Sequence, residues 1–206
     1  MRRLVIAPHM DDESLGCGGL LAKYPENATV VVVAESGQTR RAEHQMAMQV
    51  LGVSDSRCLD FEDGTTQQHM SELVRKLDEV MSDVQPDEIY LPFPSLHQDH
   101  IAVYEAGMRS ARLSMSVDHW VPNSVLVYDI AVYDVNLYPS DLRWNVFEAL
   151  TEEQADKKAA ACDAYISENP GGAHPMNSIK EICATVGHMR KVEFAEQYAL
   201  VRQVRR

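Results

Sequence analysis

Two short clusters of histidine and acidic residues are the most chemically suggestive part of the sequence. The first is Pro8-His9-Met10-Asp11-Asp12-Glu13 and the second is His97-Gln98-Asp99-His100. Imidazole and carboxylate groups are the side chains that bind a catalytic zinc ion, which takes three protein ligands and keeps a fourth position for water. The clusters therefore favour a metal-assisted hydrolase, in which the remaining carboxylates and imidazoles move protons.

The first cluster divides naturally into ligands and a base. His9 and Asp12 are three residues apart across an expected strand-to-helix turn, so both can converge on one ion. Asp11 lies between them and would point elsewhere, which leaves it available as a base. Because a metal lowers the pKa of its bound water to about 7, a nearby carboxylate can complete the deprotonation. The alternative is that these acids only cap the following helix, as such residues often do.

The second cluster can complete the site. His97 and His100 are spaced i, i+3, so at the start of a helix they share one face. One of them can complete a set of two histidines and one aspartate, and the other can stabilise an oxyanion or protonate a leaving amine. Asp99 can fix the tautomer of an imidazole. The alternative is a polar loop with surface histidines.

Apolar runs and helical spacings predict the elements that position these clusters. Strands are expected at residues 4–7, 29–34, 56–61, 88–93 and 124–133, and helices at roughly 11–23, 40–51, 67–81, 98–112, 151–167, 176–188 and 193–203. This alternation predicts an α/β, Rossmann-like three-layer fold with a mostly parallel sheet. Both clusters follow strands, and ligands of open α/β sheets collect at the carboxyl edge of the strands.

Composition limits the classes of partner. The 206 residues suit one domain, and the chain shows no repeat or linker, so residues 1–206 are expected to form a single domain. A net charge of −12 argues against nucleic acid and anionic membranes as partners. No apolar stretch approaches transmembrane length, and the first residues do not resemble a signal peptide. The four cysteines are scattered along the chain, which favours reduced, buried thiols. We therefore expect no membrane insertion and a cytoplasmic location.

The two clusters together resemble the signature of the PIG-L/LmbE family of metal-dependent N-deacetylases, which is written P-H-P-D-D-E with a later H-x-D-H. The run Gly16-Cys17-Gly18-Gly19 fits the family spacing. Arg40-Arg41-Ala42-Glu43, followed by Leu51-Gly52-Val53, resembles its R-x-x-E…A…L-G-V helix, and residues 193–198 resemble its A-E-x-F/Y tail. The sequence departs from the pattern at Met10, where the family has proline, and is short for the family.

The resemblance implies an LmbE-like fold that hydrolyses the acetamide of an N-acetylglucosamine-type sugar or glycoconjugate. By motif position, the zinc ligands would be His9, Asp12 and His100, and Asp11 would be the general base. The implied substrate is a small N-acetylated sugar. The sequence leaves the oligomeric state open; members of the family often associate, so a homo-oligomer is one option.

The resemblance also assigns supporting roles. His97 would stabilise the oxyanion, with Asp99 as its neighbouring support. Arg40 or Arg41 would contact the sugar or its aglycone, and the alternative for both is a solvated arginine at a helix start. His44 has no partner at metal-ligand spacing and is assigned to the surface or the core. His174-Pro175 is a candidate for a loop that closes over the site.

Three alternatives remain open on the sequence alone. A metal-dependent amidohydrolase of a non-sugar amide would use the same motifs. Iron(II) suits two histidines and one carboxylate as well as zinc does. A nucleotide-binding Rossmann module is less favoured. Its glycine-rich phosphate loop is superficially matched by Gly16-Cys17-Gly18-Gly19, but these glycines lie several residues into the expected helix, beyond acids that would repel a pyrophosphate.

Overall fold

The computed structural model describes residues 1–130, 140–169 and 175–205. In these residues a seven-stranded sheet has the order β3-β2-β1-β4-β5-β7-β6. Five strands are mutually parallel: β1 (Arg3–Ala7), β2 (Ala28–Glu35), β3 (Asp55–Glu62), β4 (Glu88–Pro92) and β5 (Ser124–Tyr128). Strand β7 (Phe194–Gln203) runs antiparallel to both β5 and β6 (Trp144–Leu150). The expected mostly parallel sheet is confirmed.

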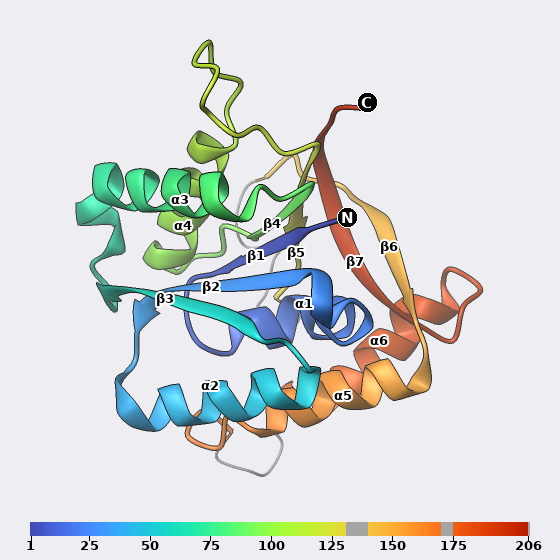
Figure 1. The fold of residues 1–206 in the computed structure, drawn as a ribbon. Helices are drawn as coiled ribbons and strands as arrows, with labels where there is room; N and C mark the ends of the chain where they lie inside the picture. Colours follow the sequence, from blue (N-terminus) through green and yellow to red (C-terminus); the bar gives the residue numbers. More distant parts are fainter. Residues whose placement is uncertain (131–139, 170–174, 206) are drawn as a thin grey trace.

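Helices cover both faces of this sheet (Figure 1). One layer contains α1 (Asp12–Lys23), α2 (Gly37–Leu51), α5 (Glu152–Asp163) and α6 (Ile179–His188), and the other contains α3 (Met70–Val84) and α4 (Gln98–Ser110). Short 3₁₀ segments span Pro25–Asn27, Thr66–His69 and Pro175–Ser178. Each face has its own apolar core. The expected three-layer α/β architecture is therefore confirmed.

The topology brings the two sequence clusters together. Strands β1 and β4 are hydrogen-bonded neighbours in parallel register, with Leu4 opposite Ile89. The first cluster follows β1 and the second follows β4, so both leave the sheet at the same carboxyl edge. The chain leaves β1 towards the α1 layer and leaves β4 towards the α4 layer (Figure 1). A change of face between adjacent strands opens a crevice at that edge, where α/β proteins bind ligands.

Two expectations for the C-terminal third are wrong. The helix expected at residues 193–203 is absent, and Phe194–Gln203 forms strand β7 instead. Their alanine, glutamate and glutamine favour helix locally, but pairing with β5 and β6 on both sides overrides that preference. Strand β6 was not expected at all. Strand β5 ends at Tyr128, before the predicted end, while residues 131–133 and His174 lie outside the described residues.

The glycine run inside α1 serves close packing. A Cβ atom on Gly16 would lie 2.1 Å from the Tyr128 ring, and one on Gly19 would lie 2.3 Å from Leu150. Helix α1 can therefore approach the sheet only because these positions carry no side chain. The run lies within the helix and not at its start, which removes the reason for considering a phosphate loop.

A buried carboxylate fixes α1 against the rest of the fold. Glu196 of β7 accepts hydrogen bonds from the backbone N–H groups of Gly19 (2.8 Å) and Leu20 (2.7 Å) and from Lys158 Nζ of α5 (2.5 Å). Glu196 and Lys158 are both almost completely buried. These contacts of Glu196 connect β7, α1 and α5, and α1 is the helix that begins in the first cluster. Across the described ranges, no helix is both long enough and apolar enough to cross a membrane.

Candidate active site

Three side chains from the two clusters converge on one point. Asp12 Oδ2 lies 3.3 Å from His9 Nδ1 and 3.3 Å from His100 Nε2. Around a tetrahedral zinc ion with bonds of about 2.0–2.1 Å, neighbouring ligand atoms stand about 3.3–3.4 Å apart. Asp12 and His100 are buried and His9 is mostly buried. Asp12 therefore lies at zinc-ligand spacing from one nitrogen of each histidine, and the three side chains expected from the sequence have the donor chemistry of a catalytic zinc site.

Two other sets of donors that share His9 lie close together among the described residues. Single nitrogens of His9, His97 and His100 lie within 4.8 Å of one another, and so do single donor atoms of His9, Asp63, His97 and Asp99, whereas Asp12 belongs to neither set. Asp63 follows β3 and is largely exposed. We favour Asp12 as the carboxylate ligand because it is buried and equidistant from two ring nitrogens, whereas the Asp63 side chain is 56% exposed.

His9 lies among carboxylates on both sides of its ring. Its Nε2 stands 3.2 Å from Asp99 Oδ2 and 3.2 Å from Asp63 Oδ1, while its Nδ1 faces Asp12. Burial opposes protonation of His9, but these neighbours outweigh burial and raise its pKa to about 10. Without a metal, His9 is therefore protonated at neutral pH, and its positive charge offsets those of the three neighbouring aspartates. A metal bound through Nδ1 must displace a proton.

His100 and Asp12, the other two residues expected to bind the metal, each have supporting contacts. His100 Nδ1 lies 3.0 Å from Ser95 Oγ, which fixes the orientation of the ring. Burial disfavours ionisation of Asp12, but His100 and His9 outweigh it and hold the pKa of this carboxyl well below its usual range. Asp12 also accepts a hydrogen bond from the backbone N–H of His9 (3.0 Å), so the turn itself prepares the carboxylate.

Asp99 supports a different ring from the one we expected. Its carboxylate contacts His9 at 3.2 Å, whereas its contact with His97 is a hydrogen bond from the Asp99 backbone N–H to His97 Nδ1 (3.2 Å). The Asp99 carboxylate also accepts from the N–H groups of Gly64 (2.7 Å) and Thr66 (3.2 Å). Although burial opposes ionisation, His9 and these donors lower the pKa of Asp99. Asp99 is thus a fixed anion beside His9.

His97 is arranged as a neutral hydrogen-bond donor. Burial, together with His9 and His100, lowers its pKa, so the ring is neutral near pH 7. Its Nδ1 accepts a hydrogen bond from the backbone of Asp99, which places the ring proton on Nε2. A neutral imidazole with a fixed Nε2–H suits the stabilisation of a developing oxyanion.

Asp11 occupies the N-cap position of α1 with an unusual backbone conformation, and its side chain does not cap the helix. Its φ is 141°, a conformation that non-glycine residues rarely adopt and that costs on the order of 1–3 kcal/mol. Its side chain makes no capping hydrogen bond to the helix. The capping alternative is therefore wrong for this residue. Strain of this kind is retained where surrounding contacts impose it, which happens most often at functional sites.

The Asp11 carboxylate is set apart from Asp12 electrostatically. Burial and the neighbouring Asp12 charge raise the pKa of Asp11 well above its usual value, against an opposing effect of Arg40. Arg40 Nη1 stands 3.6 Å from Asp11 Oδ2. Two adjacent carboxylates thus have opposite shifts, one held ionised and one made basic, which is a pattern of ligand and proton acceptor.

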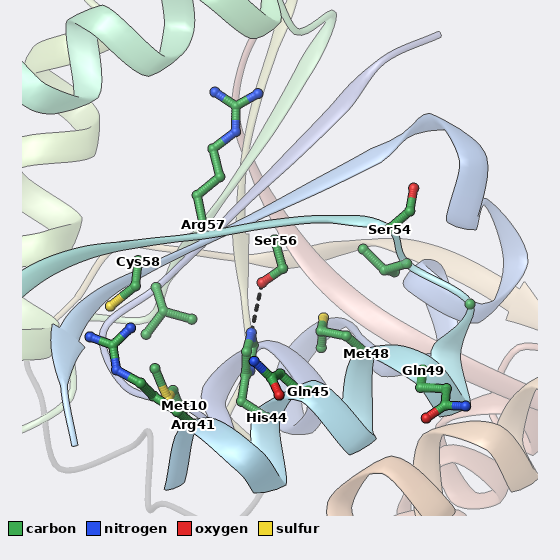
Figure 2. A pocket seen from close by; sticks show the side chains of 13 residues that line it. Met10, Arg41, His44, Gln45, Met48, Gln49, Ser54, Ser56, Arg57 and Cys58 are labelled. Atoms are coloured by element: carbon green, nitrogen blue, oxygen red, sulfur yellow. Dashed lines mark hydrogen bonds between the residues drawn. The ribbon is translucent and has the colours of Figure 1, made fainter. Parts of the chain in front are cut away.

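The two candidate arginines point to different sides of α2. Arg40 lies on the wall of a cavity of about 580 Å³, together with His9, Asp11, Asp63 and His97, and it also forms an ion pair with Glu168. Arg41 instead pairs with Asp60 (2.5 Å) and Glu35 (3.1 Å). It lines a separate cavity of about 590 Å³ between α2 and β3 (Figure 2). Arg41 is not one of the described residues that line the cavity beside His9 and His97.

The comparison with protein families agrees with this geometry. The family model described as "PIG-L: GlcNAc-PI de-N-acetylase" matches residues 4–111, a range that contains both clusters and Arg40. The chain belongs to the PIG-L family. Membership confirms the resemblance seen in the motifs and identifies the protein as an enzyme of the deacetylase type, which hydrolyses an amide bond.

PIG-L relatives extend the likeness beyond the matched range. The chain is 29% identical over 179 residues to "Uncharacterized deacetylase YaiS" of Escherichia coli (strain K12), an alignment that covers 80% of this chain and 90% of the relative. It is 30% identical over 130 residues to "Probable N-acetyl-alpha-D-glucosaminyl L-malate deacetylase 2" of Bacillus subtilis (strain 168), covering 52% and 59%. The crystal structure of the conserved protein TT1542 from Thermus thermophilus shares the fold, with a TM-score of 0.77 at 23% identity over 100% of this chain and 97% of that chain.

Some residues of this arrangement were not found from the sequence. Asp63 could have been suspected because it follows a strand at the same sheet edge. Ser95 carries no sequence signal beyond its nearness to His97. Glu43, the acid of the R-x-x-E pattern, accepts from Ser167 N (2.8 Å) and Ser167 Oγ (2.6 Å), and so anchors the segment that carries Glu168 beside the cavity.

Proposed function

We propose that the protein is a zinc-dependent N-deacetylase that hydrolyses the acetamide of an N-acetylglucosamine-type sugar or glycoconjugate. The observation that carries the proposal is the position of Asp12 Oδ2, 3.3 Å from a nitrogen of each of two histidines. The sugar class is supported by the description of the family model and by the name of the Bacillus relative.

We assign the metal to His9, Asp12 and His100. Two imidazoles and one carboxylate are a donor set that zinc takes in hydrolases, and iron(II) suits the same set. A divalent ion held there would supply Lewis acidity to a carbonyl oxygen and to water. Asp99 and Ser95 would keep the rings of His9 and His100 in their ligating orientations, through the contacts at 3.2 and 3.0 Å.

We assign the proton chemistry to Asp11 and His97. Asp11 is the more basic of the two adjacent carboxylates and lines the cavity, so it takes a proton from the attacking water. His97 donates from Nε2–H to the oxygen that gains charge as the amide carbon becomes tetrahedral. The proton held by Asp11 then passes to the nitrogen of the departing amine. The products are acetate and a free amino sugar.

We assign substrate contact to Arg40. Its guanidinium lines the cavity and lies close to Asp11, so it can both orient the base and hydrogen bond to sugar hydroxyls. Arg41, paired with two carboxylates outside this cavity, is not proposed as a substrate contact.

A single domain over residues 1–206, a cytoplasmic location and homo-oligomerisation remain predictions.

The proposal is tested by an acetate-release screen paired with metal analysis. The zinc-loaded protein is offered N-acetylglucosamine derivatives with different aglycones and, in parallel, N-acetylated amines that contain no sugar. We expect acetate and amine in equal amounts from at least one sugar derivative, and no release after chelation. Cleavage confined to the non-sugar amides would replace the sugar substrate, and activity that survives complete metal removal would end the proposal.

A further inference from the structure

Glu13, the last residue of the first motif, is an acid without an assigned role. Its side chain is completely buried, next to the proposed ligand Asp12. It accepts hydrogen bonds from Ser14 Oγ (2.8 Å), from Tyr165 Oη (2.5 Å) and from the backbone N–H of Asp11 (3.1 Å). A buried carboxylate with three donors is a fixed anchor. One of the three groups that it anchors is the strained backbone of Asp11.

Tyr165 reaches Glu13 from a distant part of the chain and has its own support. A carboxylate only accepts, so the hydroxyl proton of Tyr165 is donated to Glu13. The phenolic oxygen is then the acceptor for His44 Nδ1 at 2.8 Å. The other ring nitrogen of His44 is 2.7 Å from Ser56 Oγ, the contact drawn as a dashed line in Figure 2. A continuous chain of hydrogen bonds thus runs from Ser56 of β3 through His44 of α2 and Tyr165 to Glu13 in the first cluster.

Asp11 is held at three places, and only one of them depends on this chain. Its carbonyl accepts from the N–H groups of Ser14 and Leu15, both at 2.9 Å, which belong to the first turn of α1. Its carboxylate faces Arg40. Within the part of the chain that the structure describes, its N–H is held by Glu13 alone. Loss of that bond would allow the peptide to leave the φ of 141° and would move the carboxylate.

We propose that Tyr165 is a positioning residue for the reaction, acting through Glu13 on the backbone of Asp11. The ring of Tyr165 lies beside Arg40, whose guanidinium carbon is 5.6 Å from the ring centroid, and phenylalanine keeps that contact. The hydroxyl of Tyr165 instead orients the Glu13 carboxylate, which in turn holds the backbone N–H of Asp11. The inference rests on the proposed function, because it takes Asp11 as the base. His44 supports the same contact from the side opposite to Glu13.

The chain contains a matched control for this contact. Tyr198 Oη donates to Glu196 at 2.7 Å, and both Tyr198 and Tyr165 are completely buried or nearly so. Glu196 holds α1 at Gly19 and Leu20, two turns away from Asp11 in the sequence of the helix. Phenylalanine at either position removes one buried tyrosine-to-carboxylate hydrogen bond and keeps the ring. The two variants therefore share the loss of a tyrosine-to-carboxylate hydrogen bond and differ in which carboxylate is released, although Tyr165→Phe also removes the acceptor of His44 Nδ1.

The test compares Tyr165→Phe with Tyr198→Phe in the zinc-loaded protein. For Tyr165→Phe we expect kcat to fall by roughly ten- to hundredfold, the size typical of lost outer contacts at a site, with KM within about twofold and bound metal unchanged. For Tyr198→Phe we expect kcat near that of the wild type, although both variants melt earlier. Equal kcat values in the two variants, or a loss seen only in KM, would overturn the inference.

Hydrogen exchange provides a readout that needs neither metal nor turnover. In the metal-free protein, peptides covering residues 9–15 should exchange faster in Tyr165→Phe than in the wild type, and at the wild-type rate in Tyr198→Phe. Unchanged exchange in Tyr165→Phe would reject the contact as the anchor of Asp11. If Tyr165→Phe does not fold, His44→Leu removes the support of the same hydroxyl, and wild-type kcat in that variant would also reject the inference. A wild-type protein that releases no acetate would instead reject the proposed function.

Discussion

Asparagine in place of Asp11 removes the proposed base and keeps its shape. The backbone contacts to Glu13, Ser14 and Leu15 do not involve the carboxylate, so they survive the substitution. Asp12 and the two histidine ligands are untouched. A general base typically contributes on the order of 10²–10⁴-fold to the rate. We therefore expect Asp11→Asn to lose activity by that factor and to bind metal at the wild-type stoichiometry.

The same substitution should stabilise the metal-free protein. Burial and Asp12 raise the pKa of Asp11 in the folded state above its ordinary value of 3.8, so ionised Asp11 opposes folding at neutral pH. The penalty is absent below about pH 3.8, grows as the pH rises from there, and is complete above the folded-state pKa. Each unit of the rise corresponds to about 1.4 kcal/mol, or roughly 3–6 °C in Tm for a protein of this size.

The assay is a pair of thermal melts with metal-free wild type and Asp11→Asn, at pH 7 and near pH 4, together with acetate release by the zinc-loaded forms. We expect the variant to melt at a higher temperature at pH 7, with the difference shrinking near pH 4. Asp118→Asn is the control, because the Asp118 side chain is exposed and does not line the site cavity, so its neutralisation should change Tm little. A variant that keeps more than about a tenth of kcat would refute the base assignment, and a lower Tm at pH 7 would refute the electrostatic argument.

The remaining predictions concern the ligands and the buried pair behind α1. His100→Ala should lose both metal and acetate release, since a buried ligand disappears; metal retained at one equivalent by elemental analysis would contradict this. Zinc binding at pH 7 should release about one proton, because the pKa of metal-free His9 is about 10. Calorimetric titrations in buffers of different ionisation enthalpy measure the number of protons released. Identical binding enthalpies in all buffers would contradict the prediction. Glu196→Ala should reduce the free energy of unfolding by about 3–5 kcal/mol, because it leaves the buried charge of Lys158 uncompensated. Denaturant titrations measure this change, and a reduction under about 1 kcal/mol would show that the ion pair is dispensable.

The convergence of the proposed ligands His9, Asp12 and His100 was predictable because these residues are local in sequence. His9 and Asp12 share one strand-to-helix turn, and His100 follows a strand that the parallel topology places beside the first. Local patterns of this kind need only the correct sheet edge. The choice between Arg40 and Arg41 was not predictable, because adjacent residues on a helix face different directions and the cavity lies on one side only.

The contacts missed by sequence reasoning are those between distant segments. Tyr165 meets Glu13 across 152 positions and His44 across 121. No spacing rule connects such residues, so His44 was expected to be an ordinary surface or core side chain. Strand β7 was mistaken for a helix for a related reason, since its identity depends on pairing with β5 and β6. Local propensity decides an element only where tertiary contacts do not.

The most direct test of the central claim is a crystal of the zinc-loaded protein measured with X-rays on both sides of the zinc absorption edge. The account predicts one anomalous peak per chain, within about 2.0–2.2 Å of His9 Nδ1, an Asp12 carboxylate oxygen and His100 Nε2. A peak bound elsewhere, or one coordinated without Asp12, would contradict it.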